Sequence, residues 1–252
     1  MMNPSHDNSC MQDKIVALAN TLKLSAFSDY KSCIANSSST EEILYNLLYL
    51  ENSVREQNRY KSRMKNAAFP VIKTLDTFVF DAERLPNLKK DTVMELATCK
   101  FIEKKQNVVA LGNSGTGKTH LMIALGVEAI AKGYTVKFRR ASDLVSQMTE
   151  AVSERHLSKF IKNLNACDVL VVDEIGYLSF DSSGANLLFQ IFAARYETKS
   201  TLVTSNLEFS KWASFLGQEA YMTEALISRL VHLSVILNMN GDDYRLQNRL
   251  KK

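Results

Sequence analysis

Three of the nine glycines in this chain of 252 residues lie at positions 112, 115 and 117, directly before a lysine and a threonine. Gly112, Gly117, Lys118 and Thr119 fit the pattern G-x-x-x-x-G-K-[ST]. Glycine lets such a loop turn its backbone N–H groups inward around a polyphosphate, because it has no side chain to collide with the oxygens. We therefore predict that this glycine-rich loop binds a nucleotide. Its residues are Gly112, Asn113, Ser114, Gly115, Thr116, Gly117, Lys118 and Thr119.

The surroundings of the glycine-rich loop support this interpretation over a chance match in a flexible loop. Residues 107–112 form a short apolar run typical of a strand, and the pattern after Lys118 predicts a helix to about residue 131. The positive end of that helix would face the phosphates. Lys118 would neutralise the β and γ phosphates, and the Thr119 hydroxyl would coordinate Mg²⁺.

Two adjacent acids give the second clue. The buried-strand pattern of "DVLVVDE" delivers Asp173 and Glu174 to the carboxyl end of the strand, where ligands bind in open α/β sheets. We expect Asp173 to hold Mg²⁺ and Glu174 to orient and deprotonate an attacking water. Two acids can also simply end a strand, but behind a glycine-rich loop of this type they indicate nucleotide hydrolysis.

Two further polar residues follow regular elements. Asn206 ends the strand "TLVTSN", where its amide could contact the γ-phosphate or the water; the alternative is an asparagine that begins a turn. Arg229 in "ALISRLVH" projects from the polar side of an amphipathic helix. It could stabilise the transferred phosphoryl group of a neighbouring subunit, or be an ordinary surface arginine. Arg245 in "DDYRL" is a weaker candidate for the same work.

The pattern from about residue 106 alternates strands and helices. Near-continuous Val, Leu and Ile runs separated by helices predict an α/β fold, with a five-stranded parallel sheet covered by helices on both faces. The predicted strands are 107–112, 134–140, 168–174, 201–206 and 234–239. The predicted helices are 118–131, 157–164, a segment around 187–192, and 218–231.

A small helical domain, residues 1–66, is expected to precede the ATPase-type domain of residues 67–252. Ser39 and Glu42 stand at capping-box spacing before a helix expected over about 40–65. In residues 55–65 of this helix, five basic residues against the single acid Glu56 give a charge of +4, which equals the net charge of the whole chain. They suit contact with DNA phosphates or form an ordinary solvated face. They are Arg55, Arg59, Lys61, Arg63 and Lys65.

The bulk composition excludes several other classes of protein. No apolar run reaches the roughly 20 residues needed to cross a bilayer, and the N-terminus has no signal-peptide pattern. We therefore expect a cytoplasmic protein without membrane partners. The four cysteines and four histidines form no ligand-spaced group, which argues against a structural metal site and favours reduced thiols.

With these elements in order, the chain from about Asn66 to Leu250 resembles the IstB-like ATPases of the AAA+ class, which assist a bacterial transposase and are related to the DnaC helicase loader. The resemblance is carried by "LDTFVFD", "GTGKTHLMIALG", "DVLVVDEIGYLSFD", "LLFQIFAARYE", "TLVTSNLEFSKW" and "ALISRLVH". It implies that residues 112–119 are the Walker A loop. It likewise implies that Asp173 and Glu174 are Walker B, Asn206 sensor 1 and Arg229 the arginine finger.

The sequence departs from the family pattern at two places. Ser228 stands where relatives carry Asp, and "GDDYR" replaces Gly-Glu-Ser-Tyr-Arg. Both departures affect how subunits would contact one another. About a dozen residues follow the last predicted strand, so the helical lid of many AAA+ proteins is not expected.

The resemblance implies a function: an ATP-dependent, self-associating protein that binds duplex DNA and helps the transposase of the same element in target selection and strand transfer. Three alternatives share the nucleotide site. They are a DnaC-like replicative helicase loader, a kinase that phosphorylates a small metabolite, and an adaptor that binds ATP without hydrolysing it.

Overall fold

The computed structural model describes residues 5–35, 37, 39–217 and 220–244. The chain divides into two compact units, Met1–Ser62 and Arg63–Lys252. The predicted boundary, between residues 66 and 67, lies four residues beyond this division.

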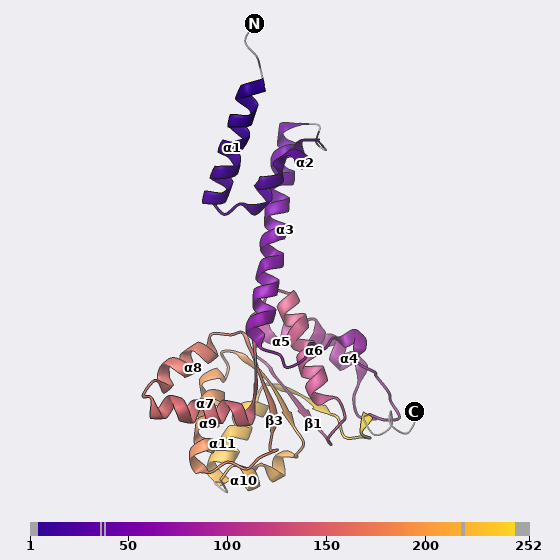
Figure 1. Cartoon of the computed structure of the whole chain (residues 1–252). Helices are drawn as coiled ribbons and strands as arrows, with labels where there is room; N and C mark the ends of the chain where they lie inside the picture. Colours follow the sequence, from indigo (N-terminus) through magenta and orange to yellow (C-terminus); the bar gives the residue numbers. More distant parts are fainter. Residues whose placement is uncertain (1–4, 36, 38, 218–219, 245–252) are drawn as a thin grey trace. The chain divides into compact units, whose positions relative to one another are not determined.

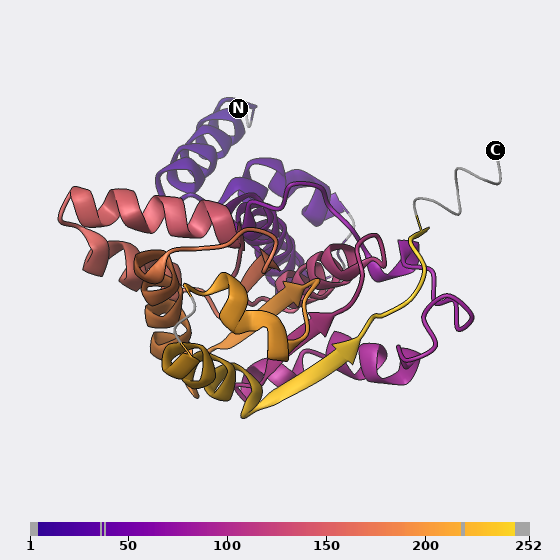
Figure 2. The same ribbon diagram turned by 90° about the horizontal axis from the view of Figure 1, so that it is seen from below.

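The larger unit is built on one sheet of five parallel strands in the order β2-β3-β4-β1-β5. The strands are β1 (Asn107–Leu111), β2 (Val136–Arg140), β3 (Val169–Ile175), β4 (Ser200–Ser205) and β5 (Ser234–Asn238). β5 forms one edge of the sheet and is the yellow arrow in Figure 2. The buried strands are rich in Val, Leu and Ile because helices cover them on both sides.

Two separate hydrophobic clusters form on the two faces of the sheet. On one face Val108, Ala110 and Val171 pack against α4 (Lys90–Ala97), α5 (Lys100–Glu103) and α6 (Lys118–Ala131). On the other face, residues such as Val109 and Val172 pack against the remaining helices (Figure 1). These are α7 (Ala141–Ser153), α8 (Leu157–Asn165), α9 (Ser182–Arg195), α10 (Trp212–Phe215) and α11 (Ala220–Val231). The predicted α/β fold, a five-stranded parallel sheet covered by helices on both faces, is confirmed.

The structure adds helices that the sequence analysis missed. α7 begins at Ala141, directly after the last residue of β2, with no glycine or proline and no side-chain cap to mark the change. α4 lies between residues 67 and 106, where we predicted no helix or strand, and it buries only Val93 and Leu96 of its eight residues. The five strands match the predicted ones within two residues at each end.

The topology brings three functional segments to one edge of the sheet. Because all strands run in the same direction, their carboxyl ends lie together. β4 lies between β3 and β1, so the residues after β4 sit between the acids of β3 and the glycine-rich loop after β1. This is the edge at which open α/β sheets bind ligands.

The smaller unit is helical, as predicted. It contains α1 (Ser5–Thr21), the 3-10 helix η1 (Ser25–Asp29), α2 (Tyr30–Ala35) and most of α3 (Thr40–Ala67). The predicted cap of α3 is confirmed, because the Ser39 hydroxyl accepts a hydrogen bond from the Glu42 N–H at 3.2 Å. None of the helices in the described part of the chain combines the length and the apolar character needed to cross a bilayer.

A polar cluster stabilises the amino end of the sheet. Lys199 Nζ lies 2.7 Å from Asp168 Oδ1, and the N–H and hydroxyl of Thr135 both donate to Asp168 Oδ2. Burial alone would raise the pKa of Asp168, but the hydrogen bonds from Lys199 and Thr135 outweigh it and lower the pKa to about 2. The folded state therefore favours the ionised carboxylate.

This lowered pKa predicts a pH-dependent contribution to stability. Ionised Asp168 stabilises the fold above the unfolded pKa, near 4, and the contribution is lost as the pH falls from about 4 towards 2. Allowing for solvent screening, we expect Asp168→Asn to lower the free energy of unfolding by about 1 kcal/mol at pH 7. Urea titrations at pH 7 and pH 3 measure this effect. An equal loss at both values would show that Asp168 acts through packing instead.

Candidate nucleotide site

A cavity of about 550 Å³ opens at the carboxyl edge of the sheet in the larger unit. One end is polar and is lined by the glycine-rich loop together with Arg140, Glu174, Thr204 and Asn206. The apolar and aromatic residues of the lining, which we call its apolar end, are Pro70, Val71, Phe78, Val79, Ile123 and Tyr244. Lys73, Thr77, Arg84 and His120 also line the cavity. A polar end continuous with an apolar chamber suits a ligand that carries both phosphates and a flat organic ring.

The glycine-rich loop follows β1 and leads into α6, as predicted. Gly117 precedes α6 with φ 95°, a left-handed conformation that glycine adopts without strain. A side chain at Gly112 would collide with the backbone of Met239, and one at Gly115 with Asp243. The glycines thus also allow the chain after β5 to pack closely against the loop. Sequence reasoning had considered only the room needed for phosphate.

Lys118 lies half-buried at the start of α6. Its Nζ donates to the carbonyl oxygens of Gly112 and Asn113, each at 2.6 Å. These two carbonyl oxygens help to hold the ammonium group over the mouth of the glycine-rich loop. An anion inside the loop would be a charge-assisted partner for it.

The two predicted Mg²⁺-binding residues contact each other directly. Thr119 Oγ1 lies 2.9 Å from Asp173 Oδ1 and 3.1 Å from Oδ2. Asp173 is 2% exposed, and the Thr204 hydroxyl also donates to its Oδ1, at 2.6 Å. A hydroxyl and a carboxylate together form the set of oxygen ligands that Mg²⁺ prefers.

Thr204 is a site residue that the sequence analysis did not identify. Its hydroxyl donates to Asp173 and accepts a hydrogen bond from the Glu174 N–H at 2.8 Å. One side chain of β4 thus fixes both acids of β3. The available signal was its place two residues before Asn206 at the carboxyl end of a predicted strand.

The backbone of Glu174 is strained, because its φ is positive in a residue other than glycine. Its φ is 61°, and the register of β3 against β4 shifts between Val172 and Ile175. The side chain is 48% exposed at the cavity, and Arg140 Nε lies 3.7 Å from its Oε2. Arg140, the last residue of β2, is a second site residue that sequence reasoning missed. The strain directs Glu174 away from the strand line and into the cavity.

The two remaining predicted site residues differ in position. Asn206 is exposed and lines the polar end of the cavity. Arg229 is not among the described residues that line it. Its Nη1 donates to the Ala225 carbonyl at 2.9 Å, and its guanidinium lies 4.9 Å from the centre of the Phe189 ring. Arg245 falls outside the described residues.

The apolar end of the cavity was not predicted, because most of it comes from residues 70–79, for which we predicted no regular element. The Phe78 ring lies 3.0 Å from the position that a Cβ of Gly117 would occupy, and it meets the His120 ring edge-on at 5.3 Å. His120 Nε2 in turn lies 3.0 Å from the Thr74 carbonyl. These contacts fix the chain before α4 beside the start of α6.

The basic residues of α3 are not equivalent. Arg55 pairs at 2.7 Å with Glu51, a carboxylate that is 5% exposed and also accepts the Ala26 N–H. Those two hydrogen bonds lower the pKa of Glu51, so Arg55 also stabilises the fold of the smaller unit. Arg59 forms an exposed pair with Glu56, Lys61 and Lys65 are exposed, and Arg63 is half-buried.

We predict that Thr204→Val lowers kcat for nucleotide hydrolysis about 10- to 100-fold, because it removes the group that positions both acids. Valine keeps the volume and shape of threonine, and nucleotide affinity should change little. Thr201→Val is a matched control in the same strand. The Thr201 hydroxyl accepts a hydrogen bond from Arg195 at the amino end of the sheet. Thr201→Val should therefore lower the free energy of unfolding and leave kcat unchanged. Equal kcat values for the two variants would show that Thr204 does not contribute to hydrolysis.

Comparisons with known proteins agree with this geometry. Residues 17–252 match the family described as IstB-like ATP binding protein. The chain is 37% identical over 244 residues to a Geobacillus stearothermophilus protein whose description names an ATP-binding protein of insertion sequence IS5376; the alignment covers 95% of this chain and 96% of that one.

Solved structures resemble the larger unit at the level of fold. A crystal structure of the DnaC helicase loader matches with a TM-score of 0.54 and 24% identity, covering 66% of this chain and 95% of that one. A DNA replication initiation factor matches with a TM-score of 0.53 and 23% identity, covering 70% of this chain and about half, 52%, of that one. The family match covers nearly the whole chain, and the protein belongs to the IstB-like ATP-binding family of insertion sequences.

Proposed function

We propose that the protein binds ATP together with Mg²⁺ and hydrolyses it to ADP and phosphate. The observation that carries the proposal is the chain of hydrogen bonds from Thr119 through Asp173 to Thr204, whose two threonines line the same cavity as the glycine-rich loop. Thr119 and Asp173 would hold Mg²⁺, which supplies positive charge to the phosphates. The loop amides and Lys118 would bind the phosphate oxygens.

Glu174 would act as the general base for water. It is the exposed acid of the pair, and its strained backbone directs it into the cavity, whereas Asp173 is buried and fully engaged. Asn206 would hold the water or the γ-phosphate from the opposite side. Arg140 would keep the Glu174 carboxylate oriented until the nucleotide is in place.

We further propose that ATP drives self-association. A single copy offers no arginine from α11 to its own cavity, since Arg229 lies against Phe189. In this proposal the site is completed by Arg229 of a neighbouring copy. The guanidinium would stabilise the charge that develops on the phosphoryl group during hydrolysis.

The assembled protein would bind duplex DNA in the cytoplasm and assist the transposase of the same insertion sequence in target selection and strand transfer. The support is the family, whose members are proteins of insertion sequences, and the basic residues of α3. Lysine and arginine release counterions from DNA phosphates without reading base sequence. Exposed Arg59, Lys61 and Lys65 fit this role best.

The likeness in fold to the DnaC loader keeps a helicase loader as the alternative. A loader would retain a replicative helicase, and a transposition helper would retain its transposase. Co-purification of the tagged full-length chain with each candidate, in the presence of ATP, separates the two readings.

A steady-state ATP hydrolysis assay with and without duplex DNA tests the proposed function as a whole. Stimulation by DNA supports a DNA-dependent ATPase. An ATP hydrolysis rate that does not change with DNA but rises when a small hydroxylated metabolite is added would favour a kinase. ATP binding with no hydrolysis in any condition would favour an adaptor.

We predict that reversing Arg59 and Lys61 to glutamate weakens duplex DNA binding at least about tenfold and lowers the salt dependence of binding by about two counterions. ATP affinity should be unchanged, because both residues belong to the other unit. Arg55 is left intact in this test, since its loss would disturb Glu51. The matched control reverses the exposed Lys159 and Lys162 of α8. If both variants bind DNA as the wild type does, α3 has no part in DNA binding.

A further inference from the structure

Arg84 is a buried cation at the wall of the cavity. The residue is only 4% exposed, yet no carboxylate in the described part of the chain pairs with it. Its Nη1 lies 3.4 Å from the Thr116 carbonyl and its Nη2 3.3 Å from the Val79 carbonyl. Its Nε is buried without any hydrogen-bond partner in the described residues.

This arrangement leaves much of the guanidinium group unsatisfied. An arginine side chain has five N–H donors and no acceptor, and only two donors are used here, at long distances. A buried charge is costly unless it is paired or well hydrogen-bonded. The unused donors, above all the buried Nε, are therefore available to acceptor atoms of a ligand. Arg84 lines the cavity and can reach such a ligand.

Arg84 also anchors the chain that follows β5. Its carbonyl accepts the Asp242 N–H at 3.3 Å, and Gly241 packs so closely on that carbonyl that a side chain there would collide with it. The Tyr244 ring lies 5.3 Å from the guanidinium carbon in a cation–π contact, and the Tyr244 N–H donates to the Gly115 carbonyl. Residues 241–244 thus connect Arg84 to the glycine-rich loop.

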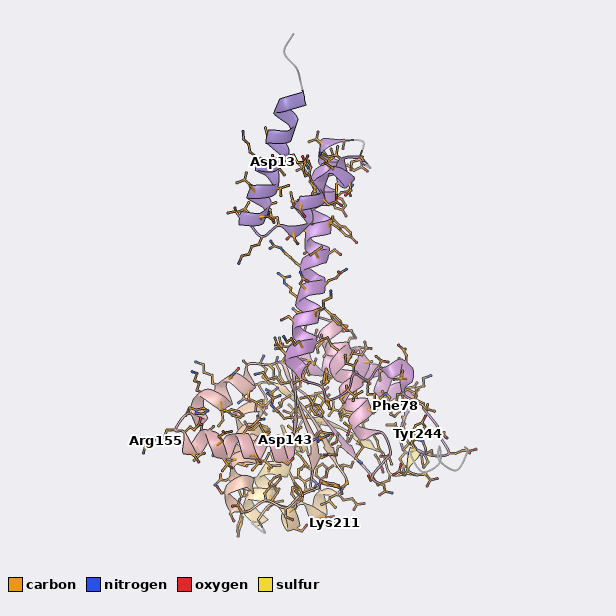
Figure 3. The ribbon with its side chains drawn as sticks, in the orientation of Figure 1. Asp13, Phe78, Asp143, Arg155, Lys211 and Tyr244 are labelled. Atoms are coloured by element: carbon orange, nitrogen blue, oxygen red, sulfur yellow. The ribbon has the colours of Figure 1, made fainter. Side chains whose placement is uncertain are left out.

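The contacts place Arg84 on the outer side of the glycine-rich loop. A loop that binds phosphate turns its N–H groups inward, so the carbonyl of Thr116, which Arg84 contacts, belongs to the outside. The neighbours of Arg84 in the cavity are Val79 and Tyr244 of the apolar end, not the acids of β3. Figure 3 labels Phe78 and Tyr244, two residues of this same end.

We propose that Arg84 is a nucleotide-binding residue that recognises the base and ribose of the bound triphosphate. The Tyr244 ring, which lies against the guanidinium group, would cover the base. The free N–H donors of Arg84 bind acceptor atoms of the nucleoside, and the planar guanidinium and the phenol ring provide flat surfaces for the base. This inference rests on the proposed ATP binding. It adds the part of the site that distinguishes a nucleotide from a bare polyphosphate.

Calorimetric titration of the full chain with Mg-ATP and, separately, with Mg-tripolyphosphate tests the inference. We expect Arg84→Met to weaken ATP binding about 10- to 100-fold and to leave tripolyphosphate affinity unchanged. Arg155→Met is the matched control: it is exposed between α7 and α8, at the far side of the unit from Tyr244 (Figure 3), and should bind both ligands as the wild type does.

Each other outcome is informative. Equal loss of both ligands would show that Arg84 only supports the glycine-rich loop, and no loss would show that it does not bind the nucleotide; either result overturns the inference. If Arg84→Met does not fold, Tyr244→Ala provides the test, because Tyr244 is 42% exposed. It should weaken ATP but not tripolyphosphate, and Tyr244→Phe should restore ATP binding. If the wild type binds neither ligand, the proposed ATP binding itself is wrong.

Discussion

Replacing Glu174 with glutamine is expected to lower the rate of ATP hydrolysis about 100- to 10,000-fold while ATP binding is retained. Glutamine keeps the size of the side chain but cannot accept a proton from water. The buried Asp173, with its partners Thr119 and Thr204, remains in place, so the phosphate end of the site is preserved. The variant should therefore accumulate in its ATP-bound, self-associated form.

Single-turnover hydrolysis and sedimentation with ATP measure these two effects. Glu150→Gln, an exposed acid of α7 in the same unit, is the matched control and should behave as the wild type does. Unchanged hydrolysis by Glu174→Gln would assign the base to another group. Loss of ATP binding would mean that Glu174 holds the nucleotide rather than activating water.

Replacing Arg229 with alanine is expected to reduce hydrolysis about 1,000-fold or more, because an arginine finger contributes about that much to phosphoryl transfer. Arg229 donates to a carbonyl of its own helix and lies against Phe189, so the substitution should change the fold and the ATP affinity of a single copy little. The loss should appear in hydrolysis and in ATP-dependent assembly.

Mixing two inactive variants gives a sharper test of the shared site. In a mixture of Arg229→Ala and Glu174→Gln chains, an Arg229→Ala copy retains its own Glu174 and can receive an arginine from a Glu174→Gln neighbour. Part of the activity should return in the mixture although neither variant is active alone. A mixture that stays inactive, while both variants still assemble, would contradict a finger supplied by a neighbour.

Much of the fold and of the phosphate end could be predicted from the sequence. Most of the strands are short runs rich in Val, Leu and Ile, and polar residues stand at the carboxyl ends of β2, β3 and β4, at the edge where ligands bind. The spacing in residues 112–119 defines the glycine-rich loop, because glycine, lysine and threonine have separate physical tasks there. Thr119 and Asp173 were predicted to share one ion, and the structure places them 2.9 Å apart.

The remaining site residues depend on tertiary contacts that no local pattern indicates. Arg84 and Phe78 come from a segment without regular periodicity, and they reach the cavity only because residues 239–244 and α6 pack around them. Thr204 looks like any strand threonine until β4 lies beside β3. Arg140 ends a strand whose following helix has no start signal. Each of these residues is brought to the site by contacts with residues that lie far away in the sequence.

Isothermal titration calorimetry of the full chain with Mg-ATP tests the central claim most directly, namely that this cavity holds a nucleoside triphosphate through the glycine-rich loop. The account predicts saturable binding of one ATP per chain by the wild type, and at least about tenfold weaker binding by Lys118→Ala, which lacks the ammonium group at the mouth of the loop. Absence of binding by the wild type, or equal affinity of both proteins for ATP, would contradict it.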